Sequence, residues 1–182
     1  MKTKVINIYG APGSGKSTLA AELYTALKKQ GTSVELVREQ VKTWIWSGHT
    51  PNFFEQVFVT NLQMKEETSH YGKVEYLITD SPIMLGGFYA GYYHNDYMVL
   101  DRLYDSIQDK ANMLGLVDKP LHLYLDLKKG NKEGGRLSGF QESQNIDAYL
   151  RSYLSFRLGN DLKHCDEDLN NRLNYCFKEL GK

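Results

Sequence analysis

A glycine-rich segment near the amino terminus constrains the fold of this chain more than any other part of the sequence. Residues 10–17 read Gly-Ala-Pro-Gly-Ser-Gly-Lys-Ser and match the pattern G-x-x-x-x-G-K-[ST] in full. The apolar, β-branched run Lys4–Tyr9 before it predicts a buried strand, and leucines at 19, 23 and 27 predict an amphipathic helix after it. Strand, glycine loop and helix together are typical of the first βα unit of an α/β fold.

The residue types of this loop are those that a bound triphosphate requires. Glycine permits the backbone torsions and the close approach that side chains would block. Successive N–H groups and the helix amino terminus then bind phosphate oxygens, while Lys16 can bridge the β- and γ-phosphates and Ser17 can bind Mg²⁺. A chance match is disfavoured by the flanking strand and helix. The predicted nucleotide site comprises Gly10, Ala11, Pro12, Gly13, Ser14, Gly15, Lys16, Ser17 and Thr18.

The rest of the chain alternates predicted strands with predicted helices. Further strands are expected at Ser33–Arg38, Val74–Thr79 and Leu121–Leu127, and a weak fifth near Leu162–Cys165. Helices are expected at Glu39–Trp46, Pro51–Tyr71, Asp96–Leu114, Asn145–Leu158 and 167–180. Residues 83–95, rich in glycine and tyrosine, are predicted to form an irregular loop. The pattern predicts a mostly parallel sheet of about five strands with helices on both faces.

Length and charge limit the possible organisation and partners. A chain of 182 residues favours a single domain spanning 1–182. Its 22 basic and 22 acidic residues give no net charge, which argues against a nucleic-acid coat but not against a local basic patch. Two cysteines, Cys165 and Cys176, favour reduced thiols in a cytoplasmic protein, and no apolar run approaches the roughly 20 residues of a membrane span.

With this motif and layout the chain resembles the P-loop NTPases. It lacks the N-K-x-D motif of GTPases, and its compact length and late basic loop are similar to nucleoside and nucleotide kinases of the nicotinamide-riboside, thymidylate and deoxynucleoside type. The resemblance implies a three-layer P-loop fold, ATP as donor, Mg²⁺ as cofactor and a nucleoside- or nucleotide-type acceptor. That acceptor should bind across the carboxyl ends of the strands.

Two acidic residues follow the strands where that acceptor is expected. Glu39 follows the second strand, and the resemblance makes it a candidate general base; the alternative is an acid that stabilises a helix amino terminus. Asp80 ends the third strand, where it can hold Mg²⁺ or contact the acceptor hydroxyl; the alternative is a turn-capping aspartate before Ser-Pro. Ser81 occupies the position where related kinases often carry arginine.

The segment 128–139 is expected to be a lid. Residues 128–136 carry four basic residues and one acidic residue among glycines, and an arginine closing from a flexible loop can stabilise the charge of phosphoryl transfer. Arg136 is the first candidate and Lys132 the second, with Arg151 and Arg157 on the next helix as further candidates. The alternative is a solvated loop without a catalytic part.

Aromatic residues cluster near both acids. Those after Asp80 could stack on a planar base or could pack a long loop on the core: Phe88, Tyr89, Tyr92, Tyr93, His94 and Tyr97. Trp44 and Trp46 lie near Glu39 and could border the acceptor pocket, although one of the two is expected in the core.

The function expected from these features is transfer of the γ-phosphate of ATP to a hydroxyl or phosphate of a nucleoside- or nucleotide-type acceptor. One alternative is a kinase of a hydroxymethylated pyrimidine base within DNA, which the aromatic segment and the basic lid would suit. Another is a regulatory NTP-binding ATPase without an acceptor. The sequence leaves the acceptor, the donor base and the oligomeric state open.

Overall fold

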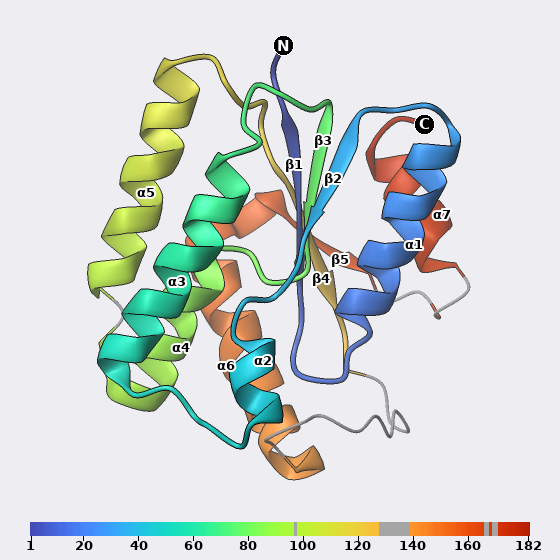
Figure 1. Ribbon diagram of the computed structural model, residues 1–182. Helices are drawn as coiled ribbons and strands as arrows, with labels where there is room; N and C mark the ends of the chain where they lie inside the picture. Colours follow the sequence, from blue (N-terminus) through green and yellow to red (C-terminus); the bar gives the residue numbers. More distant parts are fainter. Residues whose placement is uncertain (97, 128–138, 166–167, 169–170) are drawn as a thin grey trace.

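A five-stranded parallel sheet forms the centre of the protein (Figure 1). The computed structural model describes all 182 residues except 97, 128–138, 166–167 and 169–170. The strand order is β2-β3-β1-β4-β5, and every neighbouring pair is parallel. The strands are β1 (Lys4–Tyr9), β2 (Val34–Val37), β3 (Tyr76–Thr79), β4 (Leu121–Leu125) and β5 (Leu162–Cys165). The predicted five-stranded parallel sheet is confirmed, including its weak fifth strand.

Helices cover both faces of this sheet, which gives the three layers that the resemblance implied. One face is covered by α1 (Lys16–Lys29) and α7 (Arg172–Glu179), which contact each other (Figure 1). The opposite layer contains α3 (Phe53–Thr68), α4 (Met84–His94), α5 (Met98–Met113) and α6 (Phe140–Leu158). The short helix α2 (Lys42–Trp46) follows β2, and a single 3₁₀ turn, η1 (Gly159–Asp161), joins α6 to β5.

The central strand β1 shows why its sequence is mostly apolar. Ile6 and Ile8 are fully buried in the cluster that contains the leucines of α1, whereas Tyr9 is buried in the cluster formed by α4 and α6. Successive side chains of a strand point to opposite faces, so a strand covered on both faces needs apolar residues at nearly every position. This covering fixes β1, and with it the loop that follows.

The segment 83–95 is the main error of the sequence-based prediction, because it forms helix α4 and not an irregular loop. A Cβ atom at Gly86 would meet the Thr60 side chain of α3, and one at Gly87 would meet Asp101 of α5. The glycines therefore allow neighbouring helices to approach closely. The helix ends at Asn95, which has a positive φ of 57°. The predicted helix starts at 145 and 167 also differ from the observed starts of α6 and α7.

Helix α3 has a well-defined start, which matters because its side chains line a pocket. The Asn52 side chain accepts a hydrogen bond from the Glu55 backbone N–H at 3.1 Å, and the Glu55 side chain accepts one from the Asn52 N–H at 2.8 Å. This reciprocal pair is a capping box. It fixes where the helix begins.

Within the described residues, no helix combines the length and the apolar character needed to cross a lipid bilayer.

Candidate active site

The glycine loop connects β1 to α1 in a conformation that depends on glycine. Gly10, Gly13 and Gly15 have φ values of 148°, 85° and 91°, a region that residues with a Cβ rarely adopt. A Cβ at Gly10 would also lie 2.7 Å from the carbonyl oxygen of Leu125 at the end of β4. The loop thus has the torsions that the sequence motif predicted, and it also packs tightly against the end of β4.

A cation and two hydroxyl-bearing side chains lie at the junction of this loop with α1. The Lys16 Nζ donates to the carbonyl oxygens of Gly10 at 2.7 Å and Ala11 at 3.1 Å, so its side chain folds over the loop. Ser17 and Thr18 are exposed in the first turn of α1. These groups, with the backbone N–H groups of a helix amino terminus, fit a bound triphosphate.

Substituting Gly10 by alanine should destabilise the protein and weaken nucleotide binding. The new methyl group would be forced against Leu125 in a backbone conformation that alanine disfavours, so we expect a loss of about 1–3 kcal/mol in the free energy of unfolding. Chemical denaturation measures this loss, and titration with ATP measures the affinity. Gly31→Ala is the matched control, because Gly31 also has a positive φ but its Cβ would meet nothing within 4 Å. Equal losses in the two variants would contradict the packing explanation.

The two predicted acids meet at the carboxyl ends of β2 and β3, which are neighbours in the sheet. Asp80 is buried, with 6% of its surface exposed, and its Oδ1 accepts a hydrogen bond from the backbone N–H of Glu39 at 3.2 Å. The Asp80 carboxylate therefore holds the start of the segment that carries Glu39. The alternative in which Asp80 only caps its own turn does not describe this contact.

The pKa of Glu39 reports which charged groups lie near it. Burial raises the pKa of Glu39 above its ordinary value of 4.5, Lys16 opposes the rise, and Asp80 adds to it. Lys16, Glu39 and Asp80 are thus close enough to interact electrostatically. A carboxyl with a raised pKa beside a cation is a suitable proton acceptor.

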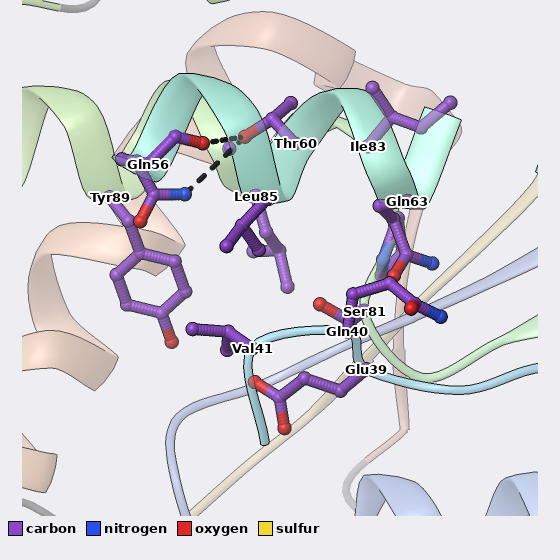
Figure 2. A pocket seen from close by; sticks show the side chains of 13 residues that line it. Glu39, Gln40, Val41, Gln56, Thr60, Gln63, Ser81, Ile83, Leu85 and Tyr89 are labelled. Atoms are coloured by element: carbon purple, nitrogen blue, oxygen red, sulfur yellow. Dashed lines mark hydrogen bonds between the residues drawn. The ribbon is translucent and has the colours of Figure 1, made fainter. Parts of the chain in front are cut away.

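Glu39 also lines a pocket whose other walls come from α3, α4 and the segment after β3 (Figure 2). The pocket has a volume of about 360 Å³, which includes space open to solvent. Its lining combines apolar side chains with polar ones, among them Glu39, Gln56, Thr60, Gln63, Ser81 and Tyr89.

The aromatic residues that the sequence placed here have different roles. Tyr89 lines the pocket, and burial, followed by Glu39, raises the pKa of its hydroxyl. Phe88 is buried in the core, where Tyr89 and Tyr92 contact its ring. Tyr93 stacks on Tyr89, the His94 ring contacts Phe53, and Tyr97 lies outside the described residues. The expectation that one tryptophan is in the core is wrong: Trp46 is 65% exposed, and Trp44 is only partly buried.

The basic candidates beyond the loop are separated by the structure. Arg136 and Lys132 lie outside the described residues, as does nearly all of the predicted lid at 128–139. Arg151 pairs with Asp126 at 2.8 Å and with Asp147 at 3.1 Å. Arg157 pairs with Asp105 and lies 3.8 Å from Asp101, so it ties α6 to α5.

One functional candidate, Arg172 of α7, was missed from the sequence. It is 2% exposed, and its guanidinium donates to the carbonyl oxygen of Ser14 in the glycine loop and, at 3.3 Å, to that of Asp126 after β4. Its position, four residues before the buried Cys176, puts an arginine on the buried face of a helix, which is the pattern that could have identified it. The guanidinium joins the loop to the neighbouring strand end.

Replacing Arg172 by methionine should loosen the glycine loop. The Ser14 and Asp126 carbonyls would lose their donor, and we expect a loss of about 2–4 kcal/mol in the free energy of unfolding together with weaker ATP binding. Arg172→Lys is the matched variant: it keeps the charge but lacks the planar fork that reaches two carbonyls, so it should recover only part of both losses. Urea unfolding and nucleotide titration measure the two effects. Unchanged ATP affinity in the methionine variant would show that Arg172 does not shape the loop.

The residues present fit a magnesium ion only in combination with a nucleotide. No group of three or more His, Cys, Asp or Glu side chains that could hold a metal occurs in the part of the chain that the structure describes. Mg²⁺, however, usually keeps several water ligands and binds through one or two protein oxygens plus the phosphates of the substrate. An exposed Ser17 hydroxyl and the Asp80 carboxylate satisfy that limited requirement.

Comparison with known proteins supports the description of the fold. A model of the AAA domain family matches residues 5–172. The structure of deoxyadenosine kinase from M. mycoides with bound dATP is 18% identical, with a TM-score of 0.60, over 98% of this chain and 100% of that one. The same kinase with the products dCMP and a flexible dCDP is 19% identical, with a TM-score of 0.61, over 97% and 98% of the two chains. The crystal structure of APE1195 is 16% identical, with a TM-score of 0.53, over 99% and 95%. No curated protein matches the chain.

Proposed function

We propose that this chain, which belongs to the AAA domain family, is a P-loop kinase that transfers the γ-phosphate of ATP to a nucleoside- or nucleotide-type acceptor. One observation carries the proposal: Lys16, Glu39 and Asp80 lie close together, and Glu39 also lines the pocket. A phosphate-binding loop alone would serve any NTPase. A carboxylate between that loop and a neighbouring pocket is what a kinase needs in addition.

The nucleotide donor would be held by the glycine loop. Backbone N–H groups at the start of α1 would bind the phosphates, and Lys16 would exchange its bonds to the Gly10 and Ala11 carbonyls for bonds to phosphate oxygens. Ser17 and Asp80 would hold Mg²⁺, which supplies positive charge to the β- and γ-phosphate oxygens when bound. The arrangement would stabilise the charge that develops during phosphoryl transfer.

The acceptor hydroxyl would be activated by Glu39. Its carboxylate would accept the hydroxyl proton while the hydroxyl oxygen attacks the γ-phosphorus and ADP leaves. Asp80 would position Glu39 through the backbone N–H that it binds. Arg136 remains the predicted source of a second cation at the transferring phosphate. Catalysis in this scheme is mainly positioning and electrostatic stabilisation.

The pocket suggests the acceptor class. The Tyr89 ring and several amide and hydroxyl groups suit a nucleobase. The M. mycoides kinase, whose fold this chain shares, binds dCMP as a product. A base flipped out of DNA would present the same chemistry as a free nucleoside. A hydroxymethylated pyrimidine within DNA is therefore kept as the second candidate acceptor.

Transfer of radiolabelled γ-phosphate to a panel of acceptors tests the proposal. The panel contains deoxynucleosides, nucleoside monophosphates and DNA containing 5-hydroxymethylpyrimidines, and we expect label on one of these classes. If DNA is labelled and the rate of labelling falls steeply with added salt, the acceptor is a base within DNA, because protein contacts to DNA phosphates release counterions and weaken as salt is added. ATP hydrolysis that no acceptor accelerates would contradict the kinase assignment and favour the regulatory ATPase.

A further inference from the structure

A small polar cluster lies buried between α3 and β3, beside the pocket. Gln63 and Glu67 are one turn apart on α3, with 4% and 2% of their surfaces exposed, and Thr79 at the end of β3 is fully buried. Gln63 lines the pocket (Figure 2). Polar side chains on the buried face of a helix need an explanation, because burying them without partners costs free energy.

Hydrogen bonds within the cluster fix the orientation of the Gln63 amide. Its Nε2 donates to the Glu67 Oε1 at 3.0 Å and to the Thr79 Oγ1 at 3.2 Å, so both amide hydrogens have acceptors. The Thr79 hydroxyl in turn donates to the same Glu67 oxygen at 3.3 Å and accepts from the Ser81 backbone N–H, also at 3.3 Å. Thr79 connects the cluster to the segment that follows Asp80.

Glu67 orients the Gln63 amide through the hydrogen bonds that its Oε1 accepts. Burial raises the pKa of Glu67 to about 8, against hydrogen bonds from Gln63, Thr79 and the Ile83 backbone. The Glu67 Oε1 and the Thr79 hydroxyl both lie on the amide nitrogen of Gln63, so the nitrogen points into the cluster and the oxygen away from these two acceptors.

The oxygen of Gln63 is the one group of this cluster without a partner. Among the described residues, its Oε1 is buried and accepts no hydrogen bond. A buried acceptor left unsatisfied costs about 1–3 kcal/mol, and a ligand that brings an N–H group recovers that cost. Because the Nε2 hydrogens are already used, Gln63 can offer the pocket an acceptor but not a donor.

We propose that Gln63 selects acceptors whose base edge carries an N–H donor, with Glu67 as the residue that positions its amide. The donor is an imide N–H or an exocyclic amine on the base edge. Gln63 is a specificity residue and takes no part in proton transfer, which stays with Glu39. The inference rests on the proposed kinase function, since it assigns a base-binding contact to the same pocket.

Two matched pairs of acceptors test the contact from the ligand side, in the wild-type protein. Thymidine is compared with N3-methylthymidine, and deoxycytidine with the 2-pyrimidinone deoxynucleoside that lacks the exocyclic amine without added bulk. For whichever pair is phosphorylated, we expect removal of the donor to lower kcat/KM at least about 100-fold, because a buried group built to bind it loses its partner. Equal kcat/KM within the pair would overturn the inference.

Gln63→Met tests the same contact from the protein side with a side chain of similar length. The variant should reduce the preference within the pair to less than about threefold. Asn61→Met, at an exposed position on the same helix, is the matched control and should keep the full preference. A Gln63→Met variant that still discriminates as wild type does would overturn the assignment, and thermal unfolding shows whether it is folded.

The two proposals fail in distinguishable ways. If the wild-type protein phosphorylates neither member of either pair nor any other acceptor in the panel, the kinase function itself is wrong. If it phosphorylates acceptors but treats those with and without the donor alike, only the role of Gln63 is wrong.

Discussion

Lys16→Ala should abolish phosphotransfer, with kcat/KM lower by at least about 10³-fold, because the variant loses the cation that contacts the transferring phosphate in the proposed mechanism. A second effect acts in the same direction. Lys16 lowers the pKa of Glu39, so its removal leaves burial and Asp80 to raise that pKa further and reduces the fraction of ionised base. The measurement is steady-state transfer of labelled phosphate, together with ATP affinity.

Lys29→Ala supplies the control for this experiment. Lys29 is exposed in the last turn of the same helix, so its removal changes the net charge equally and leaves the loop intact. Its activity should remain within about twofold of the wild type, as expected for a surface substitution. Phosphotransfer by Lys16→Ala at the wild-type rate would refute the assignment of the nucleotide site.

Glu39→Gln should lower kcat by about 10²–10⁴-fold while leaving ATP binding nearly unchanged, as expected for the loss of a general base. Glutamine keeps the size of the side chain, and the backbone N–H that binds Asp80 is untouched. The variant therefore removes the proton acceptor with little change in positioning. Isothermal titration with ATP and a transfer assay separate the two quantities.

The pH profile gives an independent readout of the same residue. The pKa of Glu39 is raised, so the base ionises only above 4.5, and kcat/KM should rise with pH through that raised value. The same shift means that the folded protein favours the protonated form of Glu39. The stability gained from this protonated carboxyl is complete below pH 4.5 and is lost as the pH rises through the raised pKa. Glu39→Gln should remove both dependences. If the Glu39→Gln variant is active and its kcat/KM still rises with pH in the acidic range, the general base is Asp80 and not Glu39.

The site was predictable from the sequence where local patterns determine it. The glycine loop needs only the residues between β1 and α1, and the rule that ligands bind at the carboxyl ends of parallel strands brought Glu39 and Asp80 to one place before their contact was known. Helix α4 was missed because glycine usually marks a loop, whereas Gly86 and Gly87 serve close packing against α3 and α5. That distinction depends on tertiary contacts.

The sequence-based prediction also did not identify the polar residues on buried helix faces. Gln63 and Glu67 lie four residues apart with Val59 on one face of α3, a pattern that predicts burial for that face but not the partners of its polar members. The orientation of the Gln63 and Glu67 side chains depends on hydrogen bonds with Thr79, which belongs to strand β3. Because such pairs form only in the folded protein, no regular spacing in the sequence predicts them.

The contact between Arg172 and Ser14 spans 158 residues of chain, and this has a consequence for the order in which the protein matures. A ribosome adds roughly 5–20 residues per second, so roughly 8–30 s separate the synthesis of the glycine loop from that of the guanidinium that holds it. Although its motif is among the first parts to be made, the nucleotide site reaches its final shape only after almost the whole sheet has formed. We therefore expect a nascent chain to bind ATP tightly only after α7 has been made.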